Sequence, residues 1–122
     1  MNQDVLKEWV TALRSGHYEQ GRERLRTSGA MTDRFCCLGV LCDLYTKDHP
    51  HARWVREMFI ADSLKESETY ETHLPPLVMK WAGLGCMDPT PPAHGKALSV
   101  LNDGGSSFED IADIIEKSWS TK

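Results

Sequence analysis

The chain has 122 residues, of which 40% are hydrophobic and 26% are charged, and its formal net charge is −4. This length fits one domain with its own core, and the composition excludes a disordered or fibrous protein. No apolar run approaches the roughly 20 residues of a membrane-spanning helix, and the first residues lack the pattern of a secretion signal. We therefore expect a small cytoplasmic protein that binds neither bulk nucleic acid nor membranes.

Two helices around a glycine are predicted at the start of the chain. Residues 4–15 carry apolar side chains at helical spacing: Val5, Leu6, Trp9, Val10 and Leu13. Gly16 follows, where a helix end favours a residue that tolerates a positive φ. A second, shorter helix is expected over residues 17–26. Its solvated face would alternate cations with acids, namely Arg22, Arg24 and Arg26 with Glu19 and Glu23.

The middle of the chain predicts a core helix followed by a small hairpin. Residues 35–45 are apolar almost all round, which indicates a buried helix. Gly39 lowers helix propensity there by roughly 1 kcal/mol, a cost that a closely packed neighbour would offset. Residues 54–60 and 69–72 have β-prone content around a polar middle, residues 62–68, and predict a hairpin or two short strands.

The last third predicts a helix, a loop, a strand and a final helix. Residues 74–83 begin with two prolines and end at a glycine, as a short helix does. A loop rich in proline and glycine follows, and residues 97–101 predict a short strand, or an extended lead-in, before the turn at residues 102–105. Ser106 and Glu109 form a capping box. The helix that they begin would bury Phe108, Ile111, Ala112, Ile115 and Trp119.

Together these elements predict the α+β class. We expect residues 1–122 to form a single, helix-rich domain with a central buried helix and a short two- or three-stranded antiparallel sheet.

The four cysteines predict buried thiols better than a metal site or a catalytic centre. Cys36, Cys37 and Cys42 fall on the apolar helix without the paired spacing of a structural zinc site, so no metal or cofactor is expected. A nucleophilic Cys37 would need a base such as His17 and an orienting acid such as Asp103, and no catalytic motif places the three together. We therefore assign no catalytic residue.

Two segments are candidates for binding a ligand. Residues 102–107 present backbone N–H groups at a helix N-terminus, where an anion is stabilised, although the nearby acids Asp103, Glu109 and Asp110 favour a plain turn and cap. Residues 13–21 gather a cation, an aromatic ring and an amide around a glycine, which also fits a tight helix corner. For a nucleotide-like ligand, the expected contacts are Arg14, Tyr18, Gln20, Trp81, Asn102, Asp103, Ser106 and Ser107.

Four segments carry a resemblance to a known family. They are Ala12–Gly21 (ALRSGHYEQG), Phe35–Leu44 (FCCLGVLCDL), Leu74–Leu84, which begins with LP and ends with WAGL, and the stretch from Leu101 to Ala112, which contains LNDGG and SFEDIA. They resemble a family of small, uncharacterised bacteriophage and prophage proteins. The resemblance implies a phage-encoded accessory protein in the host bacterial cytosol. Small phage proteins of this kind often neutralise a host factor, and some do so by sequestering a nucleotide signal.

Three functions from different classes remain open. The first is a non-catalytic counter-defence protein that sequesters a nucleotide-like signal or blocks a host protein. The second is a small hydrolase that uses Cys37 or the Asn102-Asp103 turn. The third is a DNA-binding regulator, which the acidic net charge and the lack of a basic helix face disfavour. A homodimer through the C-terminal helix with Trp119, or through a sheet edge, is also expected as an option.

Overall fold

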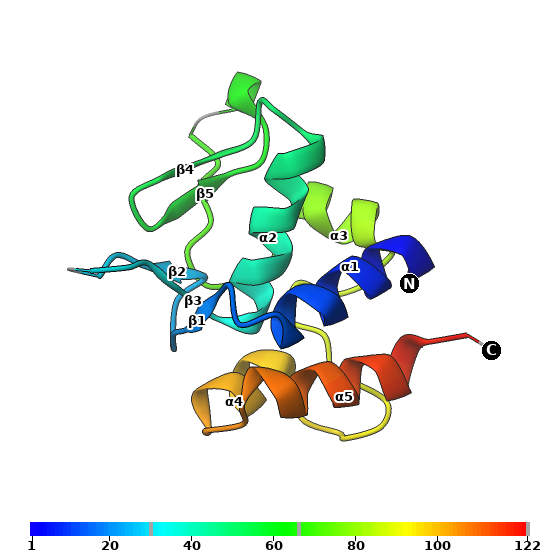
Figure 1. Ribbon diagram of the computed structural model, residues 1–122. Helices are drawn as coiled ribbons and strands as arrows, with labels where there is room; N and C mark the ends of the chain where they lie inside the picture. Colours follow the sequence, from blue (N-terminus) through cyan, green and yellow to red (C-terminus); the bar gives the residue numbers. More distant parts are fainter. Residues whose placement is uncertain (30, 66, 122) are drawn as a thin grey trace.

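The computed structural model describes residues 1–29, 31–65 and 67–121. Ala30, Lys122 and Glu66, the last within the expected polar middle of the hairpin region, lie outside the described residues. The helices are α1 (Gln3–Arg14), α2 (Cys37–Asp48), the 3-10 turn η1 (Ser63–Lys65), α3 (Pro76–Ala82), α4 (Leu98–Asp103) and α5 (Phe108–Trp119). The strands are β1 (Glu19–Gln20), β2 (Arg26–Thr27), β3 (Arg34–Phe35), β4 (Arg53–Val55) and β5 (Met58–Ile60). The α+β prediction is confirmed (Figure 1). No helix among the described residues is both long and apolar enough to cross a bilayer.

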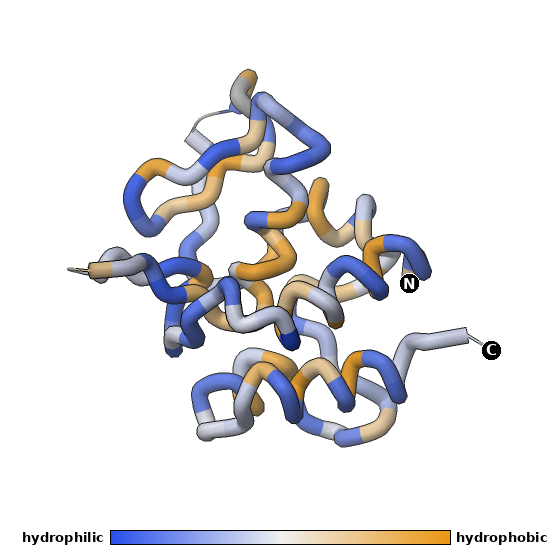
Figure 2. The backbone as a smooth tube through the Cα atoms, in the orientation of Figure 1, coloured by the Kyte–Doolittle hydropathy of each residue, from blue (hydrophilic) through white to orange (hydrophobic). Residues whose placement is uncertain are grey.

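The buried helix predicted in the middle of the chain is α2, and the other elements surround it. In Figure 1 it stands at the centre, with α1 and α3 on one side, the β4–β5 hairpin on the other and α4 below. Figure 2 shows apolar residues along most of its length. Gly39 has the close neighbour that was expected, since a Cβ built there would lie 1.7 Å from the carbonyl oxygen of Leu25. The backbone before β2 therefore packs directly on α2.

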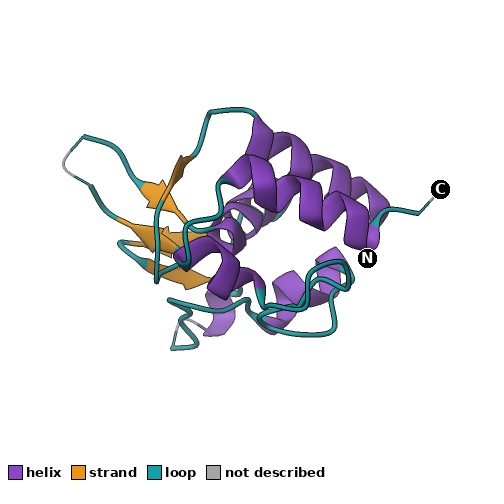
Figure 3. Ribbon diagram, turned by 90° about the horizontal axis from the view of Figure 1, so that it is seen from below, coloured by secondary structure: helices purple, strands orange, loops and turns teal. Residues whose placement is uncertain are grey.

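Helices α1 and α5 run side by side and close one face of the core (Figures 1 and 3). Each buries the apolar stripe that its sequence predicts, except that Trp119 is only partly buried. Asn2 caps α1, and its side chain accepts hydrogen bonds from the backbone N–H groups of Asp4 and Val5. The periodicity of the two segments was therefore sufficient to predict both helices.

The strands gather at one end of the molecule, away from the two chain termini (Figure 3). Strands β4 and β5 form an antiparallel hairpin, but both strands fall on the first of the two segments predicted to pair. The second segment, residues 69–72, adds only an isolated bridge from Tyr70 to Phe59. The other sheet has the order β1-β3-β2. It is mixed rather than purely antiparallel, because β1 pairs with β3 in parallel and β2 pairs with β3 antiparallel.

The helix predicted over residues 17–26 is absent, and this prediction was wrong. The segment is extended, with strands at its two ends, and Glu23 has a φ of 71° that breaks any regular run. Its one fully buried apolar side chain is Leu25, whose carbonyl accepts from Cys36 N and whose N–H donates to the carbonyl of Glu71. Pairing with distant backbone groups has therefore replaced local helical bonds.

The strand predicted over residues 97–101 was also wrong, since this segment forms most of α4. Asp88 fixes its first turn, because its carboxylate accepts hydrogen bonds from the backbone N–H and the hydroxyl of Ser99. Asn102 and Asp103 end this helix instead of opening a turn. The cap of α5 is Ser107 rather than Ser106, and its hydroxyl accepts from Asp110 N at 3.1 Å.

Candidate functional site

A polar cavity of about 500 Å³ lies where the three-stranded sheet meets the loop between α4 and α5. We call it the arginine cavity, and its lining residues are Gln20, Gly21, Arg22, Thr27, Arg34, Gly105 and Ser106. The described lining residues include two arginines and no acidic side chain. The cavity is therefore suited to an anion.

Pairing within the sheet brings one wall of the arginine cavity together. Arg34 on the central strand β3 lies opposite Glu19 of β1 and Thr27 of β2. Gly21 N continues the pairing and donates to the carbonyl of Phe35 at 2.7 Å. A Cβ at Gly21 would lie 3.0 Å from the Cβ of Arg34, so glycine permits this close approach. Residues far apart in sequence thus present two cations and a hydroxyl on one surface.

The opposite wall is the turn that leads into α5. Gly105 has a φ of 105°, a conformation that L side chains rarely adopt, and it lets the chain turn between α4 and α5. Ser106 N donates to the carbonyl of Leu101, which holds the turn against α4. The hydroxyl of Ser106 makes no hydrogen bond with any described group, so it is available to a ligand.

The two arginine side chains of the cavity are accessible, and they interact only weakly with other side chains. Arg22 is exposed and forms no ion pair with any described residue. Arg34 lies 3.6 Å from a carboxylate oxygen of Glu19, and the two side chains are 61% and 57% exposed. Ion pairs between such exposed side chains contribute little to stability, so a ligand can compete for Arg34 at small cost.

Two side-chain amides, one fully buried and one partly buried, join the walls of the cavity, and both were among the residues expected from the sequence. Asn102 is fully buried, and its Oδ1 accepts from Gln20 Nε2 at 3.0 Å. The same Gln20 nitrogen donates to the carbonyl of Ser106 at 2.8 Å. Asp103 accepts from the backbone N–H of Glu23 at 2.8 Å. The structure thus brings Gln20, Asn102, Asp103 and Ser106 together, with Ser107 next to them as the cap of α5.

The other three residues predicted to bind a ligand lie elsewhere. Arg14 donates to Asp113 at 2.6 Å and to Glu116 at 3.3 Å, and it fastens α1 to α5. Those hydrogen bonds, that to Asp113 first, raise the pKa of Arg14. Trp81 lies on α3 with its ring edge-on to Tyr45, the centroids 5.3 Å apart. Neither residue reaches the arginine cavity.

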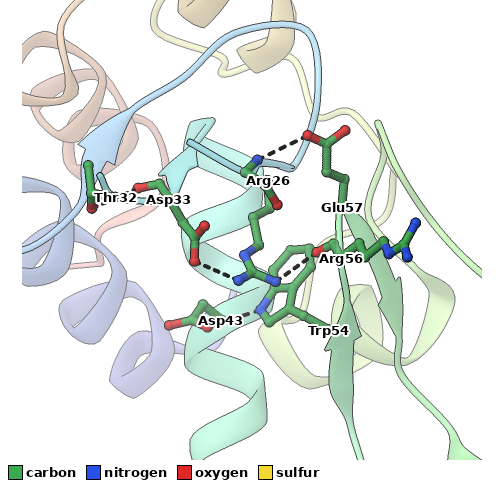
Figure 4. A network of polar contacts seen from close by, with 8 residues as sticks. Arg26, Thr32, Asp33, Asp43, Trp54, Arg56 and Glu57 are labelled. Carbon is green, nitrogen blue, oxygen red and sulfur yellow. Dashed lines mark hydrogen bonds and ion pairs between the residues drawn. The ribbon is translucent and has the colours of Figure 1, made fainter. Parts of the chain in front are cut away.

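Tyr18 belongs to a second polar network, which docks the β4–β5 hairpin onto α2 and the first sheet. Its hydroxyl donates to Asp43 at 2.6 Å, and Trp54 Nε1 donates to the other oxygen of the same carboxylate at 3.0 Å. In Figure 4 the guanidinium of Arg26 lies over the Trp54 ring and points toward Asp33. Because these groups interact with one another, we interpret the network as one that stabilises the fold.

A larger groove of about 540 Å³ between α1 and α2 is less suited to an anion. Tyr18 and His17 line it, and its described charged residues are two lysines and two acids: Lys7, Lys47, Glu8 and Asp48. The balanced charge gives no preference for either sign of ligand. The arginine cavity is therefore the stronger candidate site.

The thiols of α2 are inaccessible. Cys37 is fully buried, and its Sγ lies 3.7 Å from the carbonyl oxygen of Leu98, to which it donates. Burial raises the pKa of Cys37 well above its ordinary value and that of Cys36 to about 11. The proposed base, His17, lies in the groove between α1 and α2. The geometry therefore gives the hydrolase alternative no reachable thiolate at Cys37. Among the described residues, no group of three or more His, Cys, Asp or Glu side chains is placed to hold a metal ion.

The sequence did not single out Arg34 or Thr27 as ligand residues, and Arg22 and Gly105 entered only as members of longer segments, the charged face of residues 17–26 and the turn at residues 102–107. One signal was present in the strict alternation of Arg22, Arg24 and Arg26, because a period of two is typical of extended chain rather than helix. Arg34 and Thr27 carried no local signal, because only their pairing across β2 and β3 places them at the cavity.

Comparison with known protein families gives one match. A family model described as "Domain of unknown function (DUF8296)" matches residues 1–119, so the chain belongs to this family. The comparisons with curated proteins and with solved structures gave no match.

Proposed function

We propose that this member of the DUF8296 family is a non-catalytic protein that binds a phosphorylated, nucleotide-like small molecule in the arginine cavity. The observation that carries the proposal is the pair of accessible arginines in a polar cavity of about 500 Å³. The described residues that line this cavity include no acidic side chain. Small-molecule sites commonly occupy about 300–1,000 Å³. Guanidinium groups present paired N–H donors that match the oxygens of a phosphate.

Each polar group of the cavity has a role in this proposal. Arg22 and Arg34 neutralise the phosphate, and Arg34 exchanges its long contact with Glu19 for the ligand. The hydroxyls of Thr27 and Ser106 donate hydrogen bonds from opposite walls. The described lining residues hold no histidine or carboxylate that would activate a nucleophile, which favours binding over hydrolysis.

The resemblance to phage proteins suggests the setting. In the host bacterial cytosol, such a protein would neutralise a defence factor by sequestering a nucleotide-like signal. Blocking a host protein directly is the other mode, and it would not need the cavity. The accessible arginine pair favours sequestration.

A thermal-shift screen tests the proposal with inorganic pyrophosphate, adenine and guanine nucleotides and cyclic dinucleotides. A ligand present at 100 times its Kd stabilises a protein by about 2.7 kcal/mol, which raises Tm by roughly 10 °C for a domain of this size. The double variant Arg22→Ala/Arg34→Ala should lose this shift while keeping its fold.

The matched control is Lys80→Ala/Lys117→Ala, which removes the same charge from exposed positions on α3 and α5. This control should retain the full shift. Absence of any shift with pyrophosphate and all nucleotides, or an equal shift in the arginine double variant, would contradict the proposal.

A further inference from the structure

We infer that Gln20 and Asn102, here called the amide pair, are positioning residues that set the separation of the two cavity walls without contacting the bound anion. The inference rests on the proposed function, and it assigns these two side chains a role different from the direct ligand contact expected from sequence. The basis of the inference is that hydrogen bonds within the protein already use all of the capacity of Asn102 and nearly all of that of Gln20.

Asn102 has no capacity left for a ligand. Its Nδ2 donates to the carbonyl of Gly21 at 2.7 Å and to Asp103 Oδ1 at 3.3 Å. Its Oδ1 accepts from Gln20 Nε2 at 3.0 Å and from the backbone N–H of Cys37 at 3.1 Å. A primary amide offers two donors and two acceptor positions, and all four are occupied. The side chain is also fully buried.

Gln20 is almost as fully used. Its Nε2 donates to Asn102 and to the carbonyl of Ser106, and its Oε1 accepts from the backbone N–H of Phe108 at 3.1 Å. Both donors are therefore directed at protein oxygens, and an anion could recruit them only by breaking these bonds. Gln20 lines the cavity and connects its two walls through these hydrogen bonds.

The amide pair also caps two helices from a distance. Cys37 and Phe108 are the first residues of α2 and α5, and their N–H groups have no acceptor within their own helices. Asn102 accepts from the first and Gln20 from the second. The amide pair thus connects the sheet wall through Gly21, the turn wall through Ser106 and the first residues of both helices.

Two consequences follow for binding. The distance between Arg22 on one wall and Ser106 on the other depends on the amide pair, so anion affinity depends on side chains that do not touch the anion. Binding should in turn hold the walls together and protect the amides of Cys37 and Phe108 from opening.

The test is the Gln20→Met variant of the full chain, titrated with pyrophosphate by calorimetry. Methionine keeps the length of the side chain and adds no charge, but it removes both donors and the acceptor for Phe108. Pyrophosphate affinity should fall at least tenfold, whereas its dependence on salt should stay as in the wild type, because both arginines remain. Arg22→Ala should weaken binding and also reduce the salt dependence.

A control separates positioning from general destabilisation. Val78→Ala creates a cavity at a buried position of α3, away from the arginine cavity, and should leave pyrophosphate affinity unchanged in folded protein. Hydrogen exchange of the wild type supplies a second measurement, should Gln20→Met fail to fold. Pyrophosphate should slow exchange of the Cys37 and Phe108 amides about tenfold and leave the amides of α3 unaffected.

The outcomes distinguish the two proposals. If the wild type binds neither pyrophosphate nor any nucleotide of the thermal-shift screen, the proposed function fails and the positioning role falls with it. If the wild type binds and Gln20→Met binds equally well, only the positioning role is overturned. Unchanged exchange at Cys37 and Phe108 in the pyrophosphate-bound wild type overturns it as well.

Discussion

Asn102 is the residue on which most of the site depends, because it is the one fully buried polar side chain among the described residues. It satisfies the carbonyl of Gly21, the N–H of Cys37 and the amide of Gln20. Buried polar groups that lose their partners cost about 1–3 kcal/mol each. The residue is therefore as important for stability as a large apolar core side chain.

Asn102→Ala should lower the free energy of unfolding by about 2–4 kcal/mol, because it leaves several buried groups unpaired at once. Urea denaturation measures the change. Asn2→Ala provides the matched control, since the same truncation at the exposed cap of α1 should cost only about 1 kcal/mol. Equal losses in the two variants would show that the buried network contributes nothing beyond ordinary capping.

The four cysteines give a second prediction at the level of single residues. Cys86 is exposed, whereas Cys36, Cys37 and Cys42 are buried. A thiol reagent should therefore label one cysteine rapidly in the native protein and all four after unfolding. Rapid, pH-dependent labelling of a second cysteine in the native state would contradict this prediction and would support the hydrolase alternative.

At the scale of elements, the long helices were predictable and the short, non-local ones were not. α1 and α5 carry apolar stripes at helical spacing, and α2 carries a continuous apolar run, so local pattern sufficed. The segment 17–26 is extended because its backbone pairs with Phe35 and Glu71. α4 is helical because Asp88 holds its first turn. Phe35, Glu71 and Asp88 lie outside the segments that they hold in place, so the local sequence does not reveal these contacts.

The same difference between local pattern and long-range pairing explains which residues of the site could be predicted from the sequence. The sequence suggested Gln20, Asn102, Asp103 and Ser106 because amides and hydroxyls at glycine turns are typical of binding loops. The structure places these four residues close together, but the cations beside them depend on sheet register. A parallel pairing of β1 with β3 is a long-range event, which places Arg34 beside Glu19 and Gln20.

Gly39 tests the packing of the Leu25 segment on α2. In an isolated helix, Gly39→Ala would be stabilising by roughly 1 kcal/mol. Here the added Cβ would lie 1.7 Å from the carbonyl oxygen of Leu25, so the segment must move away. We expect a net loss of about 3 kcal/mol or more in the free energy of unfolding.

Gly85→Ala is the control for this prediction. A Cβ at Gly85 would meet no atom within 4 Å, so unfolding should be nearly unchanged. If Gly39→Ala were as stable as the wild type in urea denaturation, the contact between Leu25 and α2 would be refuted.

At the scale of the whole molecule, several buried acids respond to pH in the same direction. Burial raises the pKa of Cys36 to about 11 and that of Cys37 and Cys42 well above their ordinary value of 9.0. Burial, followed by the hydrogen bond to Asp43, also raises the pKa of Tyr18 above 10.0. Above about pH 9 the unfolded chain therefore releases protons that the native protein retains.

The free energy of unfolding should accordingly be constant with respect to these groups below about pH 8 and should fall as the pH rises beyond 9. Urea denaturation at about pH 8 and about pH 10.5 measures the loss. Cys42→Ala removes one of the contributing thiols and should reduce the loss between the two pH values. A free energy of unfolding that is the same at both pH values in the wild type would contradict the buried placement of these groups.

At the scale of the whole molecule, the helices that form the core lie apart from a polar end that carries the arginines. The other elements surround α2, and the termini lie away from the strands (Figures 1 and 3). The arginine cavity lies where the first sheet meets the turn before α5. The homodimer expected through the C-terminal helix stays a prediction, and light scattering of the purified protein would test it. The cavity is built from one chain and does not require a dimer.

The most direct test of anion binding at the arginine cavity is an NMR titration of the wild-type protein with pyrophosphate. The backbone amides of Gly21, Arg22, Gly105 and Ser106 should shift in a saturable way, while those of α3 should stay in place. Saturable shifts centred on Lys7 and Lys47 in the groove between α1 and α2, or no saturable shift at all, would contradict the account.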